Sequence, residues 1–99
     1  MLTIEKTIEN GKAVVKPAGR LDTVTAPELE REIQAIISEL SELVFDFADL
    51  EYISSAGLRV LLAAQKAMKA KGEMIVRNVN DTVLEIFEVT GFSDILTIQ

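Results

Sequence analysis

The strongest constraint on the fold is a short β-prone run, Leu-Val-Phe-Asp-Phe at residues 43–47, which lies between two stretches of helical periodicity. A run whose only charged residue is Asp46 is typical of a strand buried near the centre of a sheet. The helical stretches extend from about Ala26 to Leu40 and from Ser54 or Ser55 to the region of Gly72. Because parallel strands are joined by crossover connections that are usually helical, this order predicts an α/β fold.

The remaining strands are predicted from alternation and turn residues. Apolar residues alternate with polar ones before Asn10-Gly11 and resume at residues 13–15, which predicts a β-hairpin with a type I′ turn. Residues 74–76 form a further strand and residues 95–98 a candidate edge strand, whereas residues 48–53 are expected to be a loop. The prediction is a mixed β-sheet of four to five strands that opens with a β-hairpin, with about three to four helices.

The expected helices carry terminal signals. Thr25, followed by Glu28 three residues later, predicts a capping box at the start of the first helix. Asn80 or Asp81 is the expected cap of a third helix, which Gly91 ends. The inward face of the second helix is expected to comprise Leu58, Leu61, Leu62, Gln65 and Met68.

Composition excludes several classes of function. The 99 residues include no cysteine and no histidine, and the net charge is −6. Disulfides, thiolate or imidazole metal sites and histidine-dependent nucleophilic catalysis are therefore excluded. Negative charge disfavours binding to nucleic acid or to anionic lipid. The length predicts one domain, and the absence of an apolar leader or an 18-residue apolar span favours a cytoplasmic location without membrane insertion.

The richest candidate site is the segment 46–58, in which Ser54 and Ser55 stand at the start of the second helix. Unpaired amide N–H groups and the positive end of the helix dipole can hold a phosphate there. The residues alone favour the simpler interpretation that one of the two serines is an ordinary N-cap. Asp49 and Glu51 are too few and too unspecific to predict a metal site.

Three blocks of sequence carry a resemblance to a known family. Residues 52–62 (Tyr-Ile-Ser-Ser-Ala-Gly-Leu-Arg-Val-Leu-Leu) resemble the signature segment of STAS-domain anti-sigma factor antagonists. Residues 19–29, which begin Gly-Arg-Leu-Asp, are similar to the loop and first helix of that family, and residues 44–50 to the strand before its phosphorylation site. The resemblance extends over the whole chain and implies that residues 1–99 form a single STAS domain.

The resemblance implies a regulatory protein without enzyme activity or cofactor. In the family, the unphosphorylated form binds an ATP-bound serine-kinase anti-sigma factor and releases the sigma factor. Phosphorylation by that kinase ends binding, and a serine phosphatase restores it. The phosphoacceptor of the family lies two residues before the glycine of the Gly-Leu pair, which is Ser55 here, with Ser54 as the alternative. The expected partner-binding residues are Asp22, Thr23, Ser54, Ala56, Gly57 and Arg59.

Some of these residues have a second interpretation. Asp22 either contacts the kinase or forms a turn by accepting bonds from backbone amides, as Asp46 is also expected to do. Arg59 is either a neighbour of the phosphate or a solvated charge on a helix surface.

Two other classes of protein do not fit the sequence, and one alternative role remains open. A phosphoacceptor receiver needs an acidic pair after its first strand and a late lysine, but here the strand ends Glu9-Asn10 and no lysine follows Lys71. A serine hydrolase lacks a base beside Ser55. The remaining alternative is a STAS subunit or regulator of a membrane transport system that is not switched by phosphate.

Overall fold

A hairpin opens the fold, as predicted. The structure is a computed structural model that describes residues 2–99. β1 (Thr3–Glu9) runs antiparallel to β2 (Lys12–Leu21). Asn10 and Gly11 between them have φ angles of 52° and 80°. Positive φ at both central positions is the property of a type I′ turn, whose twist matches that of the flanking strands. The turn prediction is confirmed.

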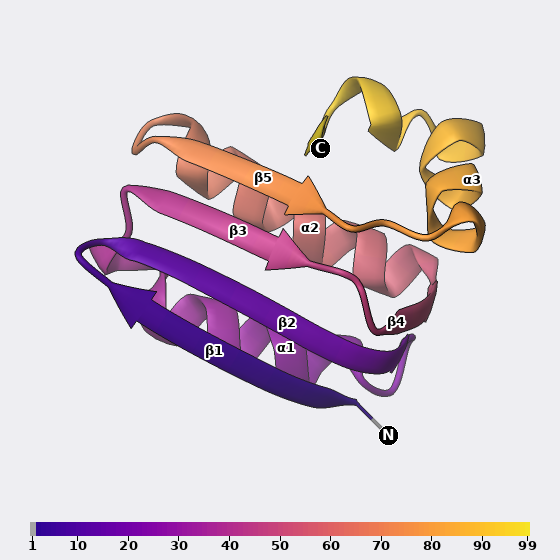
Figure 1. Ribbon diagram of the computed structural model, residues 1–99, viewed down its shortest axis with the longest axis horizontal. Coiled ribbons are helices and arrows are strands. Elements are labelled where there is room, and N and C mark those ends of the chain that lie inside the picture. The colour runs from indigo at the N-terminus through magenta and orange to yellow at the C-terminus, as the bar shows by residue number, and fades with distance from the viewer. Residues whose placement is uncertain (1) are drawn as a thin grey trace.

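Within residues 2–99, six strands form one mixed sheet. β3 (Glu42–Asp46), β5 (Glu73–Arg77) and the short β6 (Thr97–Ile98) follow β2, so that the order is β1-β2-β3-β5-β6 (Figure 1). All pairs from β2 onward are parallel. The predicted α/β class and mixed sheet are confirmed, and the strand count exceeds the predicted four to five.

The additional strand is β4 (Leu50–Ile53), in the segment that the sequence predicts to be a loop. That prediction is wrong for these four residues. β4 pairs in parallel with the end of β2, and the register shifts at Gly19, whose φ is 108°. Leu50 and Ile53 are both buried, while Glu51 between them is exposed. The bulge bends the end of β2 away from β3, which gives β4 an edge to pair with.

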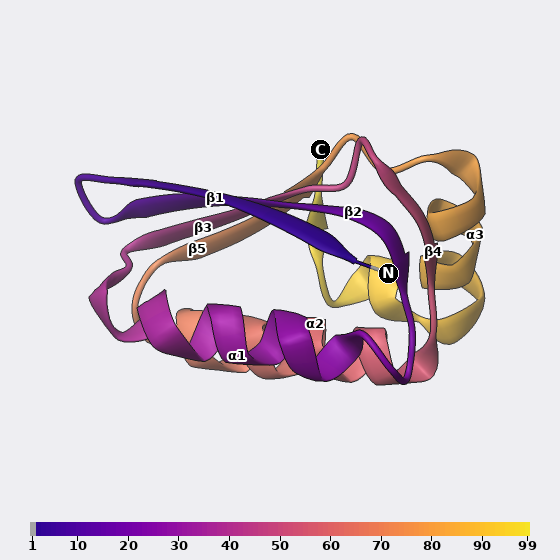
Figure 2. The ribbon, with the colours of Figure 1, turned by 90° about the horizontal axis from the view of Figure 1, so that it is seen from below.

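Two helices cover one face of the sheet (Figure 2). α1 (Ala26–Ile36) continues as a 3₁₀ turn, Ile37–Glu39, so helical backbone ends near the predicted Leu40. α2 (Ser55–Lys69) lies beside it. The predicted inward face of α2 is confirmed for Leu58, Leu61 and Met68, but Leu62 and Gln65 are only half-buried. Val60 and Ala64 are buried although they were not predicted to be. A helix that packs on both a sheet and a second helix buries a wider stripe than one that packs on a sheet alone.

A third helix closes the core at the carboxyl ends of the strands. α3 (Asp81–Thr90) lies beside β4 (Figures 1 and 2). The predicted cap is confirmed, since Asn80 Oδ1 accepts a hydrogen bond from Val83 N at 2.8 Å. Gly91 ends the helix with φ 82°, and the 3₁₀ turn Phe92–Asp94 leads to β6. Phe87 of α3 packs on Phe47, with ring centroids 6.5 Å apart.

In residues 2–99, no helix covers the second face of the sheet (Figure 2). Val14, Val44 and Ile75 lie in register across its middle. Charged residues flank this apolar row, and Lys12 and Glu42 form an ion pair at 3.8 Å on one side. Val44 is only 2% exposed, so its neighbours cover the middle of the row, whereas Val14 and Ile75 are half-buried.

Candidate functional site

The first two blocks of sequence that carry the resemblance meet where β2 and β4 end. Ser54 N donates a hydrogen bond to Leu21 O at 2.8 Å, which joins the last residue of β2 to the residue before α2. The loop 22–25 follows β2 and leads into α1, so the starts of both helices stand at this end of the sheet (Figures 1 and 2). The candidate residues of the two blocks are thereby brought together.

The two candidate serines have different environments. Ser54 is the N-cap residue of α2, with extended backbone, and its Oγ is buried without a hydrogen-bond partner among the described residues. Ser55 is the first residue of the helix and is exposed. The first amide N–H groups of a helix have no intrahelical partner, and no acidic residue occupies the first turn of α2. The exposed hydroxyl therefore stands at a helix end that favours negative charge.

Gly57 brings α2 close to the strands. A Cβ atom at this position would lie 2.7 Å from Leu21 Cγ and 2.7 Å from Ile53 Cγ1. Gly57 is buried, in contrast to its neighbours Ser55 and Ala56. Gly57 allows the helix to approach β2 and β4 closely. Because it is buried, it offers almost no surface to a partner.

Hydrogen bonds fix the loop between β2 and α1. Asp22 Oδ1 accepts from Val24 N at 3.0 Å and from Thr25 N at 3.1 Å. The bond from Thr25 N is the main cause that lowers the pKa of Asp22 below its ordinary value. The turn-forming interpretation of Asp22 is thus observed directly, and the carboxylate orders the loop beside α2.

The predicted capping box is absent. Thr25 is the N-cap residue, but its side chain makes no capping bond to the helix. Instead its hydroxyl donates to Arg20 O at 2.7 Å and accepts from Asp22 N at 2.9 Å. These bonds satisfy the hydroxyl of a residue that is only 6% exposed, as a buried polar group requires.

The remaining candidates face one small hollow. Thr23, Ala56 and Arg59 line it together with residues of α1, and its volume is about 190 Å³. Thr23 and Arg59 are exposed and Ala56 is half-buried. The structure thus brings together the predicted residues of the loop and of α2 beside the start of that helix.

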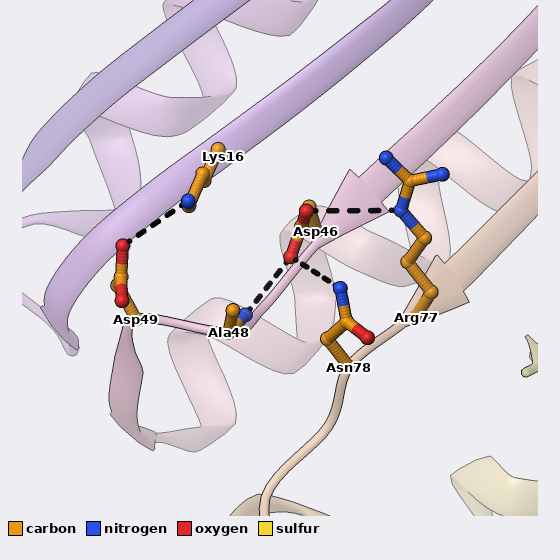
Figure 3. Close-up of polar contacts among 6 residues, drawn as sticks. All are labelled: Lys16, Asp46, Ala48, Asp49, Arg77 and Asn78. Carbon is orange, nitrogen blue, oxygen red and sulfur yellow. Dashed lines mark hydrogen bonds and ion pairs between the residues drawn. The ribbon is translucent and has the colours of Figure 1, made fainter.

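A polar cluster lies at the carboxyl ends of β3 and β5, on the helix-free face (Figure 3). Asp46 Oδ1 accepts from Ala48 N at 3.1 Å and from Asn78 Nδ2 at 3.0 Å, and Arg77 Nε lies 3.7 Å from Oδ2. Partial burial would raise the pKa of Asp46, but the hydrogen bonds from Asn78 and Ala48 and the positive charge of Arg77 hold this pKa below its ordinary value. As predicted, Asp46 bonds to a backbone amide and joins two strand ends.

Residues 2–99 contain neither a metal-ligand cluster nor a membrane-spanning helix. No three potential metal-ligating side chains of His, Cys, Asp or Glu converge there. None of the described helices combines the length and the apolar composition needed to cross a bilayer.

Known proteins share both the sequence and the fold. The sequence profile of the STAS domain matches residues 3–99. The chain belongs to the STAS family. The anti-sigma-B factor antagonist of Listeria monocytogenes is 31% identical over 84 residues, which are 83% of this chain and 74% of that STAS protein. The crystal structure of an anti-sigma factor antagonist from Mycobacterium paratuberculosis matches with a TM-score of 0.90 at 26% identity, covering 99% of this chain and 85% of the other.

A more distant STAS structure shares the fold. The Bacillus cell fate determinant SpoIIAA in its phosphorylated form matches with a TM-score of 0.75 at 19% identity, covering 100% of this chain and 91% of the other. The predicted resemblance to STAS-domain anti-sigma factor antagonists is confirmed by these comparisons.

Sequence reasoning missed three residues of this STAS site. The hydroxyl of Thr25 bonds back to Arg20 and Asp22, whereas the capping pattern predicted a bond forward to the helix. Arg20 lies over the Tyr52 ring at 4.4 Å from its centroid, a contact that depends on the unpredicted pairing of β2 with β4. Val24 is 81% exposed in the loop, and an apolar residue among three polar ones was a signal that could have been noticed.

Proposed function

We propose that this chain is an anti-sigma factor antagonist and that phosphorylation of Ser55 switches it off. The unphosphorylated form binds a serine-kinase anti-sigma factor in its ATP-bound state, which frees the sigma factor, and a serine phosphatase reverses the modification. The role is regulatory rather than catalytic, and its place is the cytoplasm. The names of the relatives in Listeria and Mycobacterium support the antagonist role.

The observation that carries the choice of serine is the contrast in exposure. Ser55 presents its side chain to solvent at the start of α2, whereas Ser54 Oγ is enclosed. A kinase must bring ATP in line with the hydroxyl oxygen, which requires an accessible hydroxyl. Ser54 therefore serves as the structural residue before the helix, and Ser55 as the acceptor.

The electrostatics support a switch that leaves the fold intact. Negative charge at a helix N-terminus is favourable by about 0.3–1 kcal/mol. A partner that covers Ser55, with Asp22, Thr23, Ala56 and Arg59 around it, would have to desolvate the phosphate. Burying an unpaired charge at an interface costs on the order of 2–5 kcal/mol, which corresponds to roughly 30-fold to several-thousand-fold weaker binding.

The test uses matched serine variants. The kinase and ATP should add one phosphate to the wild type and to Ser54→Ala, and none to Ser55→Ala, with phosphopeptide mapping as the readout. Ser54→Ala is a suitable control because its Oγ has no hydrogen-bond partner to lose. Thermal melting of the phosphorylated and unphosphorylated forms should differ little, and a loss of ten degrees or more would contradict the electrostatic argument.

Binding provides the second readout. In isothermal titration against the kinase, Ser55→Ala should bind like the unphosphorylated wild type, and Ser55→Asp and the phosphorylated protein should bind weakly. Equal affinity of all forms would refute the switch and favour a role in regulating a transport system. A label on Ser54 would refute the choice of acceptor.

A further inference from the structure

Val24 stands out because it is apolar, exposed and held in place. Its side chain is 81% exposed, the highest value among the large hydrophobic residues of the described chain. Single exposed apolar residues are common on protein surfaces. Val24 differs from them because its loop neighbour Thr23 borders the hollow that leads to the groove between α1 and α2.

The loop that carries Val24 is rigid. Val24 N is bound by Asp22 Oδ1, and Ala26 N donates to Asp22 O at 2.8 Å. Thr25, the next residue, is anchored to Arg20 O by its hydroxyl. An exposed valine on such a loop has only one side-chain torsion left to order on binding, so its burial by a partner carries a small entropic cost.

The surface next to the loop is mixed in the hollow and becomes mainly apolar along the groove between α1 and α2. Thr23, the neighbour of Val24, borders the hollow near Ser55, whose walls include Pro27, Ala56 and Val60. Glu30 and Val60 also border a groove of about 150 Å³ between α1 and α2. The apolar lining of that groove consists of Ile33, Ile37, Val60, Ala63, Ala64 and Ala67. Hollow and groove are therefore continuous.

We propose that Val24 and the groove between α1 and α2 form one apolar docking surface for the serine kinase of the proposed function, on which this inference rests. The kinase is the occupant because any protein that covers the Ser55 hydroxyl also covers the adjoining loop and the near end of the groove. Its matching surface consists of an apolar socket for Val24 and an apolar side chain that enters the groove. Charged Glu30 and Arg59 at the border fit the polar rim of such an interface.

Two variants test the two parts of the surface. Val24→Ala removes two exposed methyl groups and should weaken binding about tenfold, or about 1.4 kcal/mol. Ala63→Arg places a long side chain at an exposed position in the groove and should weaken binding at least tenfold. Neither residue has buried contacts whose loss would unfold the protein, and circular dichroism melts verify this.

The controls make similar chemical changes elsewhere, the apolar one being larger by one carbon atom than Val24→Ala. Ile8→Ala truncates an exposed apolar residue in the hairpin, at the opposite end of the sheet (Figure 1), and Ala70→Arg adds the same charge at the far end of α2. The probe is the purified kinase that phosphorylates the wild type, saturated with a non-hydrolysable ATP analogue. Both controls should bind like the wild type.

Phosphorylation kinetics give an independent readout. A docking surface away from the reacting atoms should raise KM by the same factor as Kd and leave kcat unchanged in both variants. Wild-type affinity of either Val24→Ala or Ala63→Arg overturns the inference while the proposed function stands. A wild-type dimer that Val24→Ala dissociates also overturns it, because a second copy would then be the occupant. Failure of the kinase to bind the wild type refutes the proposed function itself.

Discussion

The hydroxyl of Thr25 gives the sharpest test of how the site is held together. Thr25→Val replaces the hydroxyl by a methyl group of similar size, so that packing changes little. The hydroxyl donates to Arg20 O at 2.7 Å, with Asp22 Oδ1 as a longer alternative acceptor at 3.2 Å, and accepts from Asp22 N at 2.9 Å. Because a hydroxyl has one hydrogen to donate, its removal costs about two hydrogen bonds. Thr25→Ser is the matched control, because it keeps the hydroxyl and loses only a methyl group.

The expected destabilisation follows from these two bonds. A typical intramolecular hydrogen bond contributes about 0.5–1.5 kcal/mol net, so the loss of two costs about 1–3 kcal/mol. Loss of the methyl group in the serine control costs about 0.8 kcal/mol. For a domain of this size, 1 kcal/mol lowers Tm by roughly 4–8 °C. At the midpoint of that range, about 2 kcal/mol, the valine variant should melt roughly 8–16 °C below the wild type.

The assay is thermal and urea unfolding of the wild type and both variants. The valine variant should be the least stable, with an unchanged urea m-value, since the surface exposed on unfolding stays the same. If the docking surface exists, the valine variant should also bind the kinase more weakly, because the loop that carries Val24 loses its anchor. A valine variant as stable as the serine variant would refute the structural role assigned to the hydroxyl.

Two further predictions concern packing and pH. Gly57→Ala should lower the free energy of unfolding by about 1–3 kcal/mol, because the new Cβ atom meets buried Leu21 and Ile53. The better helix propensity of alanine offsets up to about 1 kcal/mol of this loss. An unchanged urea midpoint would contradict the close approach. The lowered pKa values of Asp22 and Asp46 stabilise the fold above their ordinary value of 3.8, and this stability is lost as pH falls through the lower values of the folded state. Unfolding from pH 6 to 2 should therefore show weakening below about pH 4, and the double Asp→Asn variant should show a shallower dependence.

The features that could be predicted from the sequence are those that depend on near neighbours in the chain. Asn10-Gly11 adopts the positive φ angles of a type I′ turn because few residue pairs tolerate them. Asn80 caps α3 through an amide three residues away. The buried run at 43–47 predicted a central strand, and β3 lies between β2 and β5.

The features that were missed depend on partners distant in sequence. β4 exists because a bulge at Gly19 directs the end of β2 toward residues about thirty positions later, and charged Asp49 and Glu51 made that segment resemble a loop. Thr25 is an exception, because its partners Arg20 and Asp22 are only five and three residues away. Its hydroxyl bonds back to the strand end and not forward to the helix, and the capping pattern does not distinguish these two directions. In the candidate site, sequence could name Ser54 and Ser55 but could not tell which hydroxyl is enclosed, since that depends on how α2 packs against β2 and β4.

Ser55 is exposed, whereas the groups that hold the site are turned toward the strands. This difference limits how far phosphorylation of Ser55 can shift the fraction of protein that is bound to the kinase. The hydrogen bonds that hold the site, among them those of Ser54 N and the Thr25 hydroxyl, reach the end of β2 and do not involve Ser55. Phosphorylation of Ser55 therefore breaks none of them and should not change the conformation of the site. The switch then equals the difference in binding free energy between the two forms. Full reversal of an equilibrium from 99:1 to 1:99 takes about 5.5 kcal/mol, slightly more than the roughly 2–5 kcal/mol that desolvation of the charge supplies. Contacts of the proposed docking surface can supply the missing binding free energy, because a kinase that the phosphate displaces also loses its contact with Val24. On this reasoning Val24→Ala lowers the affinity of the unphosphorylated form for the kinase more than that of the phosphorylated form. The ratio of the two affinities should therefore be smaller than in the wild type.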